Sequence, residues 1–247
     1  MPASKIFSEI KWTDEVDSTN SAVLRKIDSL PERFVLAARL QTDGRGQRGN
    51  RWVSAPGENL TFSVLLKDIG IPADDWMALS ESVSVAVVSL LEECGIPDAS
   101  VKWPNDIIVH GRKIAGILIE NALEGKYVTR SIIGIGLDVN QEVFPPDIPP
   151  VSSMALETGR RYDIAEILDR FIVHYTDILQ LPREEVHRRY ISRLFRFGKA
   201  SEWILPDGRR FMGTIKGVLG DGRLEIVDEC GGIRRFAFKE VVYSPLS

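Results

Sequence analysis

The chain has 247 residues, 44% of them hydrophobic and 27% charged, and a formal net charge of −4. These values predict an ordinary globular protein with one large domain and at most a small appendage, and the weak negative charge gives no general support for nucleic-acid binding. Cys94 and Cys230 are too few and too far apart for a disulfide framework or a Cys-x-x-Cys metal site. Apolar runs stay below the ~20 residues of a membrane span, and residues 1–10 lack the apolar core of a signal peptide. We therefore expect a cytoplasmic protein with no membrane association.

The first predicted elements surround a loop rich in glycine and arginine. A Ser-Thr cap predicts a helix from residue 18 or 19 to about 29. Residues 34–42 form an apolar run typical of a buried strand, and residues 59–66 alternate as a second strand. Asp74 or Asp75 then caps a long helix to about residue 94, where Gly95 ends it.

The middle of the chain predicts further strands followed by helices. A short strand at 101–103 ends at a proline. Strands at 106–109 and 113–120 are joined by a tight turn at Gly111-Arg112, and 127–139 forms another strand. Proline pairs then make a stiff connector. Two helices follow, over residues 163–181 and 182–195.

The composition changes near Gly198. Residues 203–242 contain short strands separated by Gly- and Asp-rich turns, which favours a small β-barrel. We expect two domains, 1–197 and 198–247, with the second docked on the first because fewer than about 50 residues are marginally stable alone. Strands and helices mix without strict alternation, so the predicted class is α+β, with a mixed sheet and helices mainly on one face.

The glycine–arginine loop carries the strongest functional signal. Residues 41–52 read QTDGRGQRGNRW. Glycine lets backbone amides approach a ligand, and arginine suits carboxylate and phosphate groups. The spacing is neither that of a P-loop nor that of a Rossmann turn. Arg45 and Arg48, together with loop amides, are therefore the candidate anion ligands; the alternative is a solvated basic surface loop.

Three further motifs follow in order. Lys102-Trp103-Pro104-Asn105-Asp106 places Asp106 at a strand end, where it could hold magnesium through water or simply form a turn. Lys113 begins an apolar strand, where it either extends to water or places its charge over a phosphate. Glycines within the strands, in 112–118 and 134–140, favour the close approach of a flat ring.

Together these segments resemble the biotin protein ligases. The resemblance is carried, over about residues 12–140, by Asp17-Ser18-Thr19-Asn20, Gly44-Arg45-Gly46-Gln47-Arg48-Gly49, Lys102-Trp103-Pro104-Asn105-Asp106, Arg112-Lys113-Ile114-Ala115-Gly116-Ile117-Leu118 and Gly134-Ile135-Gly136-Leu137. It implies a catalytic domain like those of class II synthetases and a small C-terminal SH3-like barrel. It also implies that biotin and ATP react, with Mg²⁺, to form biotinyl-5′-AMP, and that a lysine of a biotin carrier domain then takes the biotin.

The family pattern also implies roles for individual residues. The implied catalytic residues are Arg45, Arg48, Asp106 and Lys113. The implied biotin-binding residues are Ser18, Thr19, Asn20, Gln41, Gly44, Arg45, Gly116 and Gly134. The implied ATP or adenylate contacts are Arg45, Gly46, Gln47, Arg48, Trp52, Lys102, Asn105, Lys113, Asp138 and Asn140. Asp106 is also the candidate metal ligand.

Two positions depart from the family pattern. Gln47 stands where many members have arginine, and Asn50 lies where they carry another basic residue nearby, so we expect a looser grip on the adenylate. Asp138 stands where asparagine is usual, and a carboxylate can only accept hydrogen bonds. Asp138 could receive the adenine amino group or face magnesium, with Asn140 on the same side of the strand sharing the role.

The expected partner is the biotin carboxyl carrier domain of a biotin-dependent carboxylase. About eleven residues precede Trp12, too few for a helix-turn-helix module, so we expect no DNA binding. A homodimer formed by pairing sheet edges stays open. The alternatives are a lipoate or octanoate ligase of the same superfamily, a non-catalytic biotin sensor and a generic nucleotide-binding adaptor. The GRG loop and the KWPND motif favour biotin, the retained Arg45 and Lys113 disfavour a sensor, and an adaptor leaves the glycines within the strands unexplained.

Overall fold

The computed structural model describes residues 6–146 and 148–244, except for the Arg48 side chain. Within these residues, seven strands form one mixed sheet in the order β1-β2-β3-β7-β6-β5-β4. β1 and β2 are parallel, and the other neighbouring strands are antiparallel. The strands are β1 (Glu9–Val16), β2 (Arg33–Gln41), β3 (Leu60–Pro72), β4 (Ser100–Lys102), β5 (Asp106–Val109), β6 (Arg112–Glu124) and β7 (Tyr127–Leu137).

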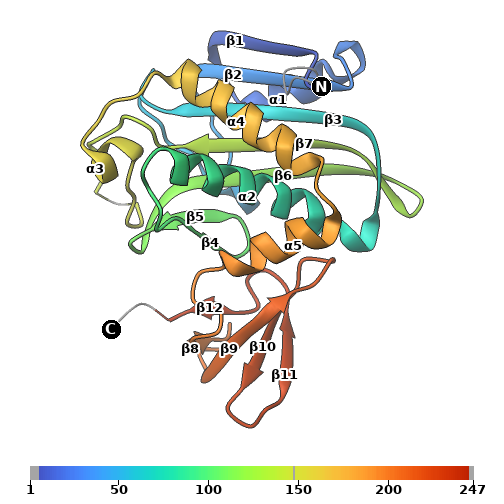
Figure 1. Cartoon of the computed structure of the whole chain (residues 1–247), viewed down its shortest axis with the longest axis vertical. Coiled ribbons are helices and arrows are strands. Elements are labelled where there is room, and N and C mark those ends of the chain that lie inside the picture. The colour runs from blue at the N-terminus through green and yellow to red at the C-terminus, as the bar shows by residue number, and fades with distance from the viewer. Residues whose placement is uncertain (1–5, 147, 245–247) are drawn as a thin grey trace.

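One face of this sheet is covered by three helices, α2 (Met77–Glu93), α4 (Ile164–Leu179) and α5 (Arg183–Ser192) (Figure 1). Alternate residues of β3 point into the core beneath them, and Phe62 meets Phe171 of α4 edge to face at 4.9 Å. Asp163 caps α4 by accepting hydrogen bonds from two backbone amides. The expected α+β class, with helices mainly on one face, is confirmed.

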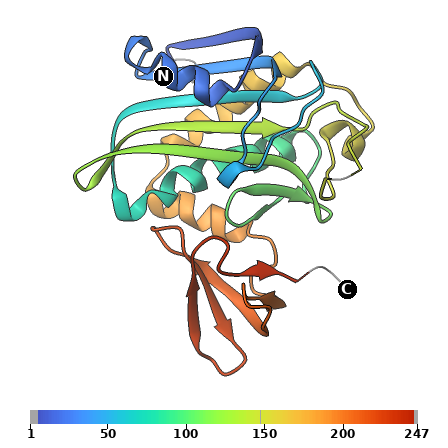
Figure 2. The same ribbon diagram turned by 180° about the vertical axis from the view of Figure 1, so that it is seen from behind.

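The opposite face carries α1 (Thr19–Arg25) (Figure 2). Val23 of this helix packs against Phe34 and Leu65 in a second apolar cluster. The helix is shorter than expected, because a 3-10 turn replaces its last residues. Asp17, just before it, accepts two hydrogen bonds from Arg25, which lower the pKa of the Asp17 carboxyl. Beside α1, the segment between β2 and β3 crosses this open face of the sheet.

Several boundaries differ from the sequence-based expectations. Residues 73–75 form a 3-10 turn, so α2 begins at Met77 and not at an aspartate cap. The tight turn before β6 lies at His110-Gly111, where both φ angles are positive (50° and 77°). Strand β1 was not expected. A short helix, α3 (Met154–Thr158), was also missed; Ser153 caps it by accepting from the Leu156 amide.

A second sheet lies at one end of the molecule, next to α5 (Figure 1). Among the described residues it has five strands in the order β11-β10-β9-β8-β12. Its strands are β8 (Ala200–Ile204), β9 (Arg210–Val218), β10 (Leu224–Asp228), β11 (Ile233–Phe236) and β12 (Val242–Tyr243).

This second sheet docks through the turn between β9 and β10. The indole N–H of Trp76 donates to the Asp221 carbonyl at 3.1 Å, and that of Trp103 donates to the Gly222 carbonyl at 3.0 Å. Gly222 has φ +85°, and a Cβ there would lie 2.5 Å from Trp76 Cζ2, so no larger residue fits without a shift. The docking therefore reaches Trp103, inside the KWPND motif.

Within residues 6–146 and 148–244, none of the helices combines the length and apolar character needed to cross a membrane.

Candidate active site

The glycine–arginine loop folds as a narrow hairpin, which we call the lid hairpin (residues 44–52). Trp52 donates its backbone N–H to the Gly44 carbonyl at 2.9 Å, and Gly46 donates to the Asn50 carbonyl at 2.7 Å. A 3-10 turn over Gln47–Gly49 forms its tip. A Cβ on Gly44 would lie 2.5 Å from the Trp52 carbonyl oxygen, so glycine is required for the two arms to meet.

Trp52 lies on a floor of two glycines. Gly116 of β6 and Gly136 of β7 are cross-strand partners on the open face of the sheet. A side chain on Gly136 would overlap the Trp52 indole, and a Cβ on Gly116 would lie 3.1 Å from its Cζ3 atom. In this structure the flat ring that these glycines accommodate is the Trp52 indole, and the expected close approach of a ligand ring stays a prediction. A ligand that uses this floor must first displace the indole.

The N-terminus of α1 builds a polar end of the site. The Thr19 backbone N–H and hydroxyl both donate to Gln41 Oε1, at 2.7 and 3.2 Å. The Ser63 hydroxyl lies 2.5 Å from Asn20 Oδ1 and 2.7 Å from Thr19 Oγ1. Because Gln41 Oε1 is held by two donors, its NH₂ group is the part of the amide left to donate to a ligand.

Gly134 makes room for a side chain of the polar end. A Cβ built on it would lie 2.5 Å from Asn20 Oδ1. The missing side chain therefore makes room for the Asn20 amide, which packs between Gly134 and Ser63. Gly134 also lines the cavity, so its predicted contact with the biotin ring stays a prediction.

Lys113 and Asp106 form the charged end of the site. Lys113 Nζ lies 2.6 Å from Asp106 Oδ1, and both side chains are about one-third exposed. The ammonium also lies 5.6 Å from the centroid of the Trp52 ring, within cation–π range. The Lys113 backbone is anchored on both sides, since its N–H donates to the Pro150 carbonyl and its carbonyl accepts from the Ser152 N–H.

One cavity of about 290 Å³ joins the two ends. This is near the lower limit of the roughly 300–1,000 Å³ of small-molecule sites. It brings together most of the residues predicted from the sequence: Ser18, Thr19, Asn20, Gln41, Arg45, Gly46, Gln47, Trp52, Lys102, Asn105, Asp106, Lys113, Gly116 and Gly134.

The second sheet completes the wall of this cavity. Phe238, Val241, Val242 and Tyr243 line it, and Lys102 Nζ lies 5.7 Å from the centroid of the Tyr243 ring. Sequence reasoning missed these four residues, because nothing in a short barrel-like pattern indicates which of its residues face another domain.

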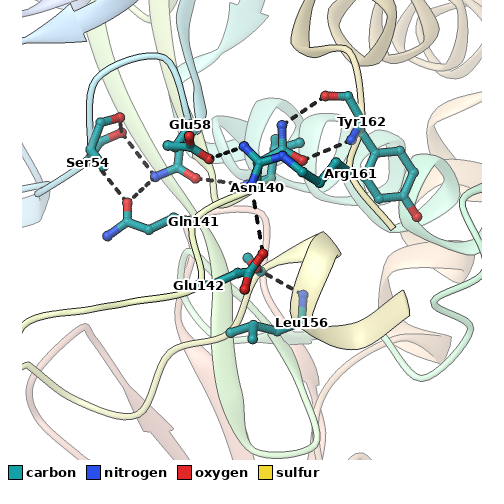
Figure 3. A network of polar contacts seen from close by, with 12 residues as sticks. Ser54, Glu58, Asn140, Gln141, Glu142, Leu156, Arg161 and Tyr162 are labelled. Atoms are coloured by element: carbon teal, nitrogen blue, oxygen red, sulfur yellow. Dashed lines mark hydrogen bonds and ion pairs between the residues drawn. The ribbon is translucent and has the colours of Figure 1, made fainter. Parts of the chain in front are cut away.

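Asn140 lies away from the cavity. Its Nδ2 donates to the Tyr162 carbonyl at 2.8 Å and its Oδ1 accepts from the Tyr162 N–H at 2.9 Å. Figure 3 shows this pair beside the ion pairs of Arg161 with Glu58 and Glu142. Both ends of the buried amide are occupied, so Asn140 supports the chain between β7 and α4. An adenine contact, as predicted for Asn140, would require it to give up this pair with Tyr162.

Asp138 is also outside the lining of the cavity. Its side chain is buried, and within the described residues its Oδ1 has no hydrogen-bond partner. Burial raises the pKa of this carboxyl well above its usual range, while the positive charge of Lys113 acts in the opposite direction. The predicted contact with adenine or magnesium would therefore require Asp138 to become accessible.

The structure describes the side chain of Arg45 but not that of Arg48. The Arg45 guanidinium forms an ion pair with Glu120 of β6, a residue that sequence reasoning missed. The sequence signal that could have found Glu120 is the two-residue period of a strand, which places it on the same face of β6 as Gly116 and Leu118. The Arg48 side chain lies outside the described part of the structure, so its predicted role stays a prediction.

Comparison with known proteins decides the family. Residues 12–138, half of the chain, match the Biotin/lipoate A/B protein ligase family. The chain belongs to this family. The match contains the lid hairpin, the KWPND motif, Lys113 and both glycines of the floor, so the elements that build the cavity are family elements.

Two curated members of the biotin/lipoate ligase family are similar to this chain. The bifunctional ligase/repressor BirA of Bacillus subtilis is 34% identical over 171 residues, covering 68% of this chain and 50% of that protein. The biotin–[acetyl-CoA-carboxylase] ligase of Paracoccus denitrificans is 35% identical over 163 residues, covering 62% and 65%. The chain therefore spans about half to two-thirds of the length of these relatives.

Solved structures agree with the fold. The biotin protein ligase of Aquifex aeolicus in complex with biotin and ATP is 28% identical, with a TM-score of 0.79 over 96% of this chain and 100% of that one. The Helicobacter pylori biotin acetyl coenzyme A carboxylase synthetase with bound biotinylated ATP is 25% identical, with a TM-score of 0.63 over 92% of this chain. With 96% and 92% of this chain covered, both matches take in residues of the seven-stranded sheet and of the second sheet.

Proposed function

We propose that this chain activates biotin with ATP as biotinyl-5′-AMP and transfers the biotin to a lysine of a biotin carrier domain. The observation that carries the proposal is the layout of the cavity. A polar end at Thr19 and Gln41, a flat floor of two glycines and a cationic end at Lys113 follow one another along the sheet. These three surfaces, in this order along the cavity, complement biotin, which has a polar ring, an apolar chain and a carboxylate.

Lys113 is the group we assign to the first step. A carboxylate oxygen of biotin attacks the α-phosphorus of ATP, and the bond from that phosphorus to the β-phosphate oxygen breaks, so pyrophosphate leaves. Negative charge grows at the α-phosphate during this step, and an ammonium held at the end of the floor stabilises it. The anchored Lys113 backbone and the ion pair with Asp106 support a fixed position for that charge.

In the second step, the amine of a carrier lysine attacks the biotinyl carbonyl of the adenylate, and AMP leaves. Asp106, beside Lys113, is the carboxylate that can accept a hydrogen bond from this amine. The lid hairpin has to shield the adenylate from water and then admit the lysine. Trp52, which now covers the floor, is the residue of the hairpin best placed for this shielding.

We propose that Mg²⁺ binds as part of its complex with ATP. Among the described residues, no group of three or more His, Cys, Asp and Glu side chains could hold a metal ion. The Asp106 carboxylate, the candidate ligand from sequence, is paired with Lys113. The residues do not fit a dedicated metal cage, whereas Mg²⁺ commonly binds through substrate phosphates. We therefore treat it as part of the ATP complex.

We also propose the domain division 1–197 and 198–247. The helices end at Ser192 and β8 begins at Ala200, which supports a boundary in this interval. The second domain then contributes to the cavity through Tyr243 and its neighbours. The carboxylase carrier domain stays the proposed partner.

One assay tests the function. The protein is incubated with ATP, Mg²⁺ and either biotin or octanoate, and mass spectrometry detects the adenylate and the mass gained by a biotin carrier domain. We expect biotinyl-5′-AMP and a biotinylated carrier. Adenylate from octanoate alone would favour the lipoate or octanoate ligase alternative, and an adenylate that is never transferred would favour a sensor. No product with either acid would reject the proposal.

A further inference from the structure

Glu120 ties together three segments that are far apart in sequence. Its carboxylate pairs with the Arg45 guanidinium of the lid hairpin. The same oxygen, Oε2, accepts a hydrogen bond from Asn20 Nδ2 of α1 at 2.8 Å. Glu120 itself stands on β6, on the face that carries Gly116. One carboxylate thus connects the hairpin, the polar end of the cavity and the sheet.

Asn20, the partner of Glu120 in the polar end of the cavity, is held in place by its surroundings. Asn20 is 2% exposed, fills the space left by Gly134, and is bonded to Ser63 and to the Leu118 carbonyl. A carboxylate that accepts from such a buried amide has little freedom to move. Glu120 is therefore a fixed point to which the lid hairpin is attached through Arg45.

A second ion pair among the described side chains of this loop offers a contrast. Arg51 and Asp43 are 2.9 Å apart, but their side chains are 71% and 66% exposed, and both residues belong to the same loop. Such a pair neither reaches the sheet nor escapes screening by solvent. Among the hairpin side chains that the structure describes, Arg45 is thus the arginine that fastens the hairpin to the sheet.

From this arrangement we infer that Glu120 is a positioning residue of the ligase: it holds Arg45 and Asn20 so that the lid hairpin closes over the cavity in one register. This inference rests on the proposed function. Arg45 then acts as an anchor, and the cation that meets the α-phosphate is Lys113. This differs from the family-based expectation that the Arg45 side chain itself holds the ligand anion.

The test compares Glu120→Ala, Glu120→Gln and Arg45→Ala, singly and as the double alanine variant, with Asp43→Asn as the matched control. Biotin KM, kcat for adenylate formation and the adenylate release rate are measured for each, and thermal unfolding checks the fold. Glu120→Gln keeps an acceptor for Asn20, so it retains the fold if the alanine variant loses it.

We expect Glu120→Ala and Arg45→Ala each to raise the biotin KM and the adenylate release rate by about tenfold, with the double variant no worse than either, because the two act as one unit. Adenylation kcat should change by less than about threefold, since neither residue contacts the reacting phosphorus. Glu120→Gln should lie between Glu120→Ala and the native chain. Asp43→Asn should match the native chain.

Two results would overturn the inference. Native kinetics for Glu120→Ala would show that the pair is an ordinary surface contact. A kcat for Arg45→Ala about 100-fold below that of Glu120→Ala would show that Arg45 touches the phosphate.

Amide hydrogen exchange of residues 44–52 in the ligand-free protein gives a readout that needs no substrate. It should accelerate in Glu120→Ala but not in Asp43→Asn. This exchange measurement therefore still tests whether Glu120 anchors the lid hairpin if the native chain makes no adenylate. Equal exchange rates in the native chain and all variants would overturn the inference.

Discussion

Lys113 Nζ lies 2.6 Å from Asp106 Oδ1, so the lysine at the start of β6 and the aspartate at the start of β5 face the cavity as a pair. Replacing Lys113 with alanine should leave the fold intact, since its side chain is partly exposed. It should lower the rate of adenylate formation by about 100-fold or more, because the charge at the α-phosphate is lost. Single-turnover kinetics checks this, with Lys126→Ala, on the exposed β6–β7 turn, as control. Ordinary activity in Lys113→Ala would remove its assigned role.

Gly136 should tolerate no side chain. A Cβ on Gly136 would stand where the Trp52 ring now lies, so Gly136→Ala should fill the space above the floor that a flat ligand needs and weaken biotin binding by about tenfold. Titration calorimetry with biotin measures the change. Gly217→Ala is the matched control, since it lies in a strand with nothing within 4 Å of its Cβ. Equal affinities for the two variants would contradict the assignment of the floor.

The docking of the second sheet depends on Gly222. Gly222 and Gly208 are both turn glycines, with φ of +85° and +84°, but only the Cβ of Gly222 would collide with Trp76. Alanine at Gly208 should cost about 1 kcal/mol of backbone strain. Alanine at Gly222 should cost about 1–3 kcal/mol more, because the collision adds to the strain. Urea denaturation measures both, and equal losses would show that the contact with Trp76 is not tight.

Gln47 lines the cavity without carrying a charge. Gln47→Arg should slow the release of the adenylate by about tenfold, because an arginine can form charge-assisted hydrogen bonds with its phosphate. Rapid-dilution measurements of the release rate compare this variant with the native chain. Equal rates would refute the idea that this chain holds its intermediate more loosely than relatives with arginine at this position.

Asp138 should make stability depend on pH. Its folded-state pKa is raised above the ordinary value of 3.8, so the folded state binds more protons than the unfolded state above that pH. Its contribution to stability is therefore lost progressively as pH rises above about 4. Asp138→Asn lacks this titration, so the free energy of unfolding of the variant relative to the native chain should increase from pH 4 to pH 7. Thermal and urea unfolding across this range test it, and a constant difference would contradict the shift.

Local chemistry was enough to predict most of the elements. The apolar run at 34–42, the glycine after α2 and the Asp163 cap each act within a few residues, so the corresponding strand and helices appear close to where they were expected. Strand β1 was not predicted because none of its eight residues is buried in the structure, so its sequence carries no strong period-two pattern of buried apolar residues. The start of α2 was displaced because the neighbouring aspartates form a turn that packs near Gly220.

Residue types and their order were also enough to indicate the cavity and its family, since glycines, lysine and the GRG loop retain their chemistry wherever they lie. The tertiary structure decided which partner each side chain takes. The register of β3, β7 and β6 places Gly134 beside Asn20 and Gly136 beneath Trp52. It also brings Glu120 to Arg45, 75 residues earlier in the chain, and the docked second sheet adds Tyr243 to the wall. Such pairings depend on long-range strand order and domain contacts, which no short stretch of sequence encodes by itself.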